Sequence, residues 1–143
     1  MKDRGKAQRL TAGWFLVSAL VSPLAMARAG EHNGADLYAE HCARCHGANL
    51  QGQAGWRDRR PDGKLPAPPH DASGHTWHHS DRQLMAIVRD GLAAIVPGYE
   101  TDMPAYGSVL SDSQIRSILQ YIKASWPEQE RAYQKARSED DPE

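Results

Sequence analysis

Two cysteines and a histidine in close succession, Cys42-Ala43-Arg44-Cys45-His46, constrain this chain more than any other feature of its sequence. The C-x-x-C-H spacing is the signature of covalent haem attachment. On a helical turn the two thiols can reach the two vinyl groups of one porphyrin and form thioethers, while the adjacent imidazole becomes an axial ligand of the iron. The motif therefore predicts one haem c, bound through Cys42 and Cys45 and ligated by His46.

Three other interpretations of the cysteine pair stay open. A thioredoxin-like dithiol requires a strand before the motif, and no strand pattern precedes it. A plain disulfide is compatible with an exported chain but leaves His46 without a role. A structural zinc site requires a second pair of ligands, and the spacing of the remaining histidines is a weak zinc pattern. The histidines available to such a site are His70, His75, His78 and His79.

The first 29 residues have the three parts of a secretory signal peptide. Residues 1–9 are basic, residues 10–24 are mostly apolar, and Ala27-Arg28-Ala29 matches the small-x-small cleavage pattern. We predict cleavage after Ala29 and a periplasmic location in a bacterium. The alternative is an uncleaved anchor in which residues 10–27 tether the protein, although this run is shorter than the about 20 apolar residues of a typical span.

The charge of the exported part limits its partners. The chain has 17 Lys and Arg and 18 Asp and Glu, and residues 1–29 hold five of the basic and one of the acidic residues. The remainder therefore has 12 basic against 17 acidic residues, a formal charge of −5. Nucleic-acid-binding proteins usually present a basic face, so we predict no nucleic-acid partner.

Short helical patterns separated by loops predict an all-α fold. We expect helices over residues 34–41, 82–90 and 112–126, each preceded by a capping side chain. Residues 128–137 of the charged extension 128–143 are predicted to form a surface helix, whereas residues 138–143 are too acidic and polar to pack.

The stretch between the first two helices, residues 48–80, is rich in Gly and Pro and shows no helical or strand period. A loop of this length is unusual in a compact domain unless something else orders it. The remainder after residue 29 has no phenylalanine, because the single Phe15 lies in the signal. Such a domain has a thin core of its own, and a haem enclosed by the loop would fill it.

A second axial ligand is expected from Met103, in Thr101-Asp102-Met103-Pro104-Ala105-Tyr106-Gly107. A thioether stabilises ferrous iron relative to a second imidazole and so raises the reduction potential. Met85 lies on the apolar face of the helix 82–90, where packing in the core is the expected role.

With the cysteine motif, the Met103-Pro104 segment and the closing helix, residues 34–126 resemble the class I c-type cytochromes. The resemblance implies three to five helices wrapped around one covalent haem in a domain over residues 30–127. It also implies a helix crossing at which Gly34 and Tyr38 meet Tyr121. A proline carbonyl is implied to accept the Nδ1–H of His46, for which we choose Pro68 over Pro66 and Pro69.

The segment from His70 to His79 departs from the family pattern, because it is unusually rich in histidine. Trp77 is predicted to donate its indole N–H to a haem propionate. The histidines have three open roles: a second metal site, replacement of Met103 as the sixth ligand, or polar positions on the surface.

The expected function is that of a periplasmic electron carrier that meets redox partner proteins and catalyses no reaction of its own. With both His46 and Met103 on the iron, no open position is left for a substrate. Two alternatives stay open: a haem subunit of a larger periplasmic oxidoreductase, and a small haem peroxidase or ligand sensor with a labile sixth ligand.

Overall fold

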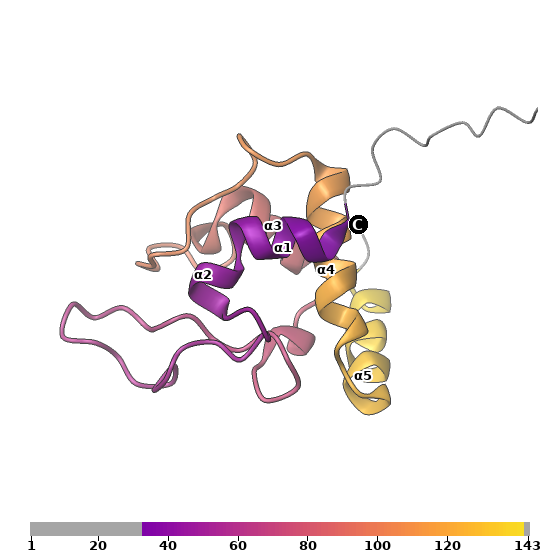
Figure 1. The fold of residues 1–143 in the computed structure, drawn as a ribbon, viewed down its shortest axis with the longest axis horizontal. Coiled ribbons are helices and arrows are strands. Elements are labelled where there is room, and N and C mark those ends of the chain that lie inside the picture. The colour runs from indigo at the N-terminus through magenta and orange to yellow at the C-terminus, as the bar shows by residue number, and fades with distance from the viewer. Residues whose placement is uncertain (1–32, 142–143) are drawn as a thin grey trace, which may run out of the picture.

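The computed structural model describes residues 33–141, so the predicted signal peptide lies outside the described residues. In this range five α-helices and two 3-10 turns are joined by loops, no strand is present, and the predicted all-α fold is confirmed (Figure 1). None of these helices has the length and apolar character needed to cross a bilayer. The elements are α1 (Gly34–His41), α2 (Ala43–His46), η1 (Thr76–His78), α3 (Asp81–Asp90), η2 (Leu92–Ala94), α4 (Asp112–Ala124) and α5 (Glu128–Glu139).

Side-chain caps set the starts of the three predicted helices. Asn33 Oδ1 accepts a hydrogen bond from the Ala35 N–H at 3.1 Å, which satisfies a free donor in the first turn of α1. Ser80 caps α3 by accepting from the Gln83 N–H. In α4, Ser111 and Gln114 form a capping box in which each side chain accepts from the backbone of the other.

The first and fourth helices cross closely, as Figure 1 shows. A Cβ atom on Gly34 would lie 2.0 Å from the carbonyl oxygen of Ser117, so only glycine permits this approach. The rings of Tyr38 and Tyr121 pack beside the crossing with centroids 5.3 Å apart. The crossing that the family resemblance implied is therefore present.

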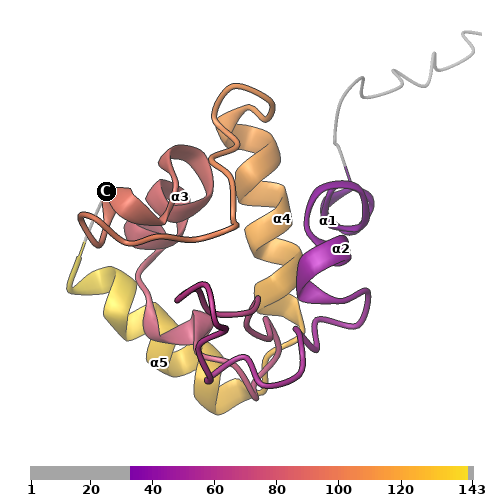
Figure 2. The ribbon, with the colours of Figure 1, turned by 90° about the vertical axis from the view of Figure 1, so that its left-hand side faces the viewer.

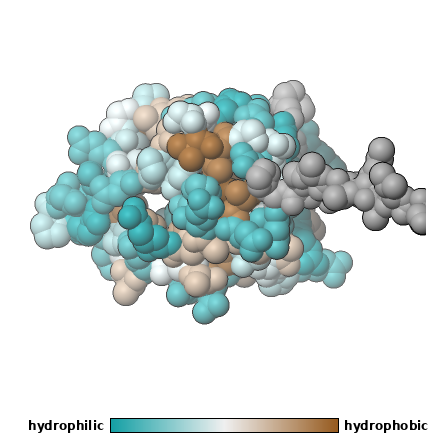
Figure 3. All heavy atoms as spheres, turned by 45° about the horizontal axis from the view of Figure 1, so that its top comes forward, coloured by the Kyte–Doolittle hydropathy of each residue, from teal (hydrophilic) through white to brown (hydrophobic). Residues whose placement is uncertain are grey.

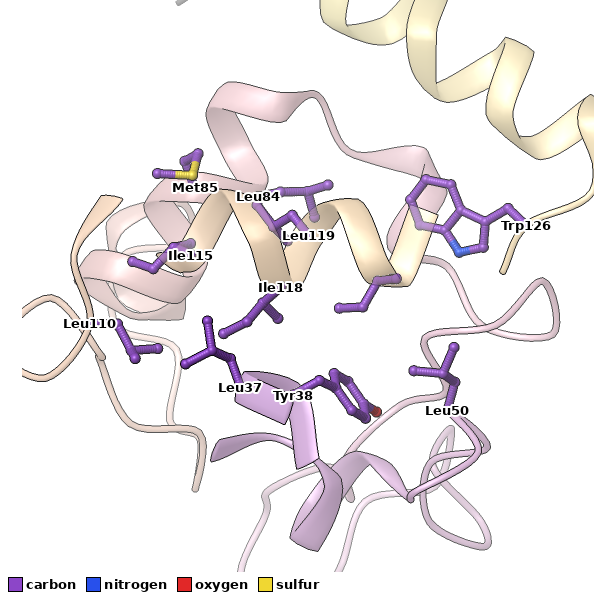
Figure 4. Packing of buried hydrophobic residues seen from close by; sticks show 11 residues of the cluster. Leu37, Tyr38, Leu50, Leu84, Met85, Leu110, Ile115, Ile118, Leu119 and Trp126 are labelled. Carbon is purple, nitrogen blue, oxygen red and sulfur yellow. The ribbon is translucent and has the colours of Figure 1, made fainter. Parts of the chain in front are cut away.

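The apolar core lies between α1, α3 and α4 (Figure 4). Met85 is one of its members, which confirms the packing role predicted for it. The apolar stripe of α4 contributes four residues to this core, more than any other helix. The buried apolar residues are Leu37, Tyr38, Leu50, Leu84, Met85, Leu110, Ile115, Ile118, Leu119, Ile122 and Trp126.

The surface is mostly polar in the view of Figure 3, with one small apolar patch. Three large apolar side chains of the described residues are exposed: Val96, Val109 and Tyr133.

The last helix, α5, packs against the η1 turn and the start of α3, away from α1 and α2 (Figure 2). Buried Gln134 donates to the carbonyl of His79 and to Asp81 Oδ1. The prediction that residues 138–143 do not pack is wrong for two of them. Ser138 Oγ accepts from the Asp81 N–H at 3.0 Å, and Asp141 accepts from Ser80 and Arg82. The free N–H groups at the start of α3 and its capping serine supply the polar partners that make this packing favourable.

Candidate haem site

The cysteine motif lies on the turn where α1 ends and α2 begins. Cys42 is the C-cap residue of α1, and Cys45 and His46 belong to α2. Both cysteines are free, with Cys42 partly buried and Cys45 exposed. Burial raises the pKa of the Cys42 thiol to about 11, and the neighbouring Cys45 adds to the rise. At neutral pH Cys42 is therefore a protonated thiol.

The imidazole of His46 is buried, with an exposed fraction of 6%. Its Nδ1 lies 2.8 Å from the carbonyl oxygen of Pro68, so the Nδ1–H donates this hydrogen bond and Nε2 is left for a metal. Burial lowers the pKa of His46, and the bond to Pro68 opposes that change only in part. The ring is neutral, as a metal-ligating imidazole must be.

Two glycines make room for the prolines beside His46. A Cβ on Gly52 would lie 2.4 Å from the nitrogen of Pro69, and a Cβ on Gly74 would lie 2.0 Å from its carbonyl oxygen. The chain therefore closes on the Pro68–Pro69 step from both sides. Of the three prolines considered from the sequence, Pro68 is the one whose carbonyl meets His46.

These residues fit haem c. The donor set is two free thiols and one neutral imidazole on a single turn, and the imidazole already has the backbone hydrogen bond that orients an axial ligand. Beside His46, the Nδ1 atom of His70 is buried without a hydrogen-bond partner in the described part of the chain. A buried orphaned nitrogen of this kind is typical of a site completed by another group.

The Met103 segment lies on a second loop, which lines a cavity of about 480 Å³ together with the η2 turn. Met103 itself is half-buried. Three residues later, the Tyr106 hydroxyl donates to the carbonyl of His41 at 2.7 Å, and its backbone N–H donates to Val88. Tyr106 therefore ties the Met103 loop to the end of α1, next to the cysteine motif.

On its other side the Met103 loop is held by ion pairs between Asp102 and two basic residues. Asp102 accepts from the Arg60 guanidinium and, at 2.6 Å, from Lys64 Nζ, both on the long loop that follows α2. The hydrogen bonds from Arg60 and then from Lys64 lower the pKa of Asp102 to about 2. This Asp102 cluster joins the two loops that border the cavity.

Asp102→Asn is expected to lower the free energy of unfolding, by an amount that depends on pH through the pKa of Asp102. A carboxylate has a pKa of about 4 in the unfolded chain, and that of folded Asp102 is about 2. The stabilisation is therefore present above pH 4 and is lost as the pH falls towards 2. Urea unfolding of both proteins between pH 2 and 7 should show their difference in unfolding free energy shrinking over this window, and shrinking in high salt. The control is Asp58→Asn in the same long loop; an equal loss there would contradict the role of the Asp102 cluster.

Trp77 lies with the C-terminal helix. Its indole Nε1–H points to the carbonyl of Ala72 at a long 3.4 Å, and its ring meets Tyr133 of α5 edge to face at 5.4 Å. The role predicted for Trp77 at a haem propionate stays a prediction.

The histidines of the 70–79 segment contact different partners, although the rings of His75 and His79 meet edge to face with centroids 5.6 Å apart. His70 stacks on His46, His75 stacks on Trp56, and His78 contacts Tyr133. Among residues 33–141 no group of three or more His, Cys, Asp or Glu side chains is arranged to hold a metal ion. The lining of the Met103 cavity contains none of these histidines. His75 and His78 are exposed, in agreement with a surface role for these two.

Sequence reasoning missed three contributors to the site: the stack of His70 on His46, the anchoring hydroxyl of Tyr106, and the Asp102 cluster. Tyr106 and Asp102 adjoin Met103 in the sequence, which was a usable signal. For His70 the position directly after the two prolines was the signal. The pairing of Asp102 with Arg60 and Lys64, about forty residues away, has no counterpart in the sequence pattern.

Comparison with known proteins gives two matches. The family described as "Cytochrome C oxidase, cbb3-type, subunit III" matches residues 29–122. The "Cbb3-type cytochrome c oxidase subunit FixP" of Azorhizobium caulinodans is 28% identical over 102 residues. That alignment covers 71% of this chain but 30% of the relative, so the chain corresponds to less than a third of it. No solved structure matches the chain.

Proposed function

Because the chain belongs to the cbb3-type cytochrome c oxidase subunit III family, we propose that it passes single electrons between partner proteins on a haem ligated by His46 and Met103. The chain is a c-type cytochrome of the class I kind, and it carries covalent haem c for electron transfer. Bound haem supplies a one-electron iron couple. The observation that carries the proposed ligation is the buried His46 ring, oriented by Pro68 with its Nε2 unused.

The protein's own residues hold and tune the site. Cys42 and Cys45 supply the thioether links, and Pro68 makes the His46 imidazole a stronger donor by accepting its Nδ1–H. Met103 is proposed as the second ligand because it lies on the loop that Tyr106 ties beside the cysteine motif. If His46 and Met103 both ligate the iron, they would leave no open position for a substrate, so we propose that the protein is not itself an enzyme.

The proposed location is the periplasm, with residues 1–29 as a cleaved signal and residues 30–127 as the cytochrome domain. If the apolar run 10–27 is kept, it becomes a membrane tether for the same domain. Proteins are the proposed partners, and the exposed Val96 and Val109, on the loops before and after Met103, offer apolar surface for a close approach.

A second candidate is a haem subunit of a larger periplasmic oxidoreductase. The name of the FixP relative describes such a subunit. In this chain α5 follows the matched residues 29–122 and packs onto the domain, so its outer face is a surface on which a larger assembly could dock. Purification from the native source through a tag separates the two candidates. A stoichiometric partner supports the subunit, and a monomeric haem protein supports the carrier.

The proposal is tested on the full chain, expressed with a haem-attachment system and purified. Expected are one covalent haem per chain, low-spin optical spectra in both oxidation states, and a reductive titration that follows a one-electron Nernst curve. Peroxide turnover, or rapid carbon monoxide binding by the reduced protein, would instead support the peroxidase or sensor alternative and overturn the carrier.

A further inference from the structure

We propose that His70 is a positioning residue for the His46 imidazole, and that Trp126 holds His70 in place. The inference rests on the proposed ligation of the haem by His46. It assigns to the histidine-rich segment a role other than a second metal site or a sixth ligand.

The rings of His46 and His70 are stacked nearly parallel. Their centroids lie 3.9 Å apart, and the angle between their planes is 16°. The bond from Nδ1 to Pro68 fixes one direction of the His46 ring but allows it to rotate about the Nδ1···O axis. A flat ring against its face blocks that rotation. Pro68 and His70 together therefore define the plane of His46, which neither contact does alone.

The stack also argues against His70 as the sixth ligand. A ring that covers the face of His46 at van der Waals distance would lie beside the first ligand and would not be free to serve as the second. The remaining freedom of His70 is small, because the edge of its ring rests against Tyr38 with centroids 5.8 Å apart.

The backbone of His70 is held by two hydrogen bonds. Its N–H donates to the carbonyl of Leu50 at 2.8 Å. Its carbonyl accepts from the indole Nε1–H of Trp126 at 2.7 Å. Trp126 is buried, with an exposed fraction of 1%, and it follows α4 outside the matched residues 29–122. Through Trp126, the segment that follows α4 thus holds the residue whose ring covers His46.

His70 has no other evident task. Its Nδ1 is buried without a hydrogen-bond partner among residues 33–141. Burial, and then the proximity of His46 and His75, lower the pKa of His70 well below its usual value. The contact of the His70 side chain that bears on the His46 ring is therefore its flat face.

The test compares His70→Leu, which keeps volume but loses the flat face, with His70→Phe, which keeps a flat face. The readouts are the g values of the ferric protein in electron paramagnetic resonance, which respond to the orientation of the axial ligand planes, and the midpoint potential. His70→Leu is expected to change or broaden the g values and shift the potential, whereas His70→Phe stays close to wild type. Trp126→Phe, which removes the indole donor, is expected to change the g values in the same sense but less.

The matched control is His78→Ala, an exposed histidine of the same segment that contacts Tyr133 and is expected to change neither readout. Unchanged g values in His70→Leu, with a low-spin wild-type spectrum, would overturn the positioning role and leave the proposed function intact. A wild-type protein without a low-spin, histidine-ligated spectrum would overturn the proposed function and this inference with it. If His70→Leu does not mature, Trp126→Phe decides, and g values identical to wild type would count against the proposal.

Discussion

Met103→Ala is expected to abolish the weak far-red absorption band that a thioether ligand gives with ferric iron, and to open the reduced protein to carbon monoxide. Met103 is the proposed sixth ligand, and its loop is held from both sides by Asp102 and Tyr106, so truncating its side chain is expected to leave the sixth position open. If Met103 dissociates from the iron in about one wild-type molecule in a hundred, wild type binds carbon monoxide about a hundredfold more weakly than a variant whose sixth position is always open. A gain in carbon monoxide affinity of that order is expected, measured by optical titration.

The control for this substitution is Met85→Ala. Met85 is buried in the core, so its truncation is expected to cost about 2–5 kcal/mol of stability while the far-red band persists. Two results would contradict the assignment of Met103. One is a band that survives Met103→Ala, and the other is a wild-type protein that is low-spin without the band, which would point to a nitrogen ligand.

Gly34→Ala is expected to destabilise the protein, although alanine normally favours a helix over glycine. The added Cβ would lie 2.0 Å from the carbonyl oxygen of Ser117 and 3.2 Å from Cβ of Tyr121, so α1 and α4 must move apart. The carbonyl oxygen of Ser117 is a backbone atom, so it cannot relieve the clash by changing a side-chain rotamer. Overpacking of this kind costs about 1–3 kcal/mol, which lowers the Tm of a domain of this size by roughly 10 °C. Thermal unfolding of the haem-loaded protein, followed by circular dichroism, measures the effect.

A substitution at Ala39 of the same helix provides the comparison. Ala39 is exposed, and Ala39→Gly is expected to cost only about 1 kcal/mol through helix propensity. If Gly34→Ala were as stable as wild type, the two helices would not approach as closely as the structure has them. A low yield of haem-loaded protein for Gly34→Ala but not for Ala39→Gly would agree with the same close approach.

The sequence by itself determined the features that depend on short stretches of chain. The spacing of Cys42, Cys45 and His46 places three reactive groups on one turn wherever that turn lies in the fold. Capping residues and a 3.6-residue apolar period likewise act within one helix, so the starts of α3 and α4 were predicted to within one residue. The family resemblance supplied the crossing of α1 and α4.

Only the tertiary structure decided which distant groups meet. Which of three neighbouring prolines faces His46 depends on how Gly52 and Gly74 close on the chain. The stack of His70 on His46 depends on the path of the long loop, and the bond from Trp126 to His70 depends on a return of the chain across 56 residues. The end of the chain was predicted not to pack because its composition is polar, yet Ser138 and Asp141 find partners at the start of α3. Composition reports how much apolar surface a segment can bury, whereas the free hydrogen-bond donors of another helix become available to it only once the fold has formed.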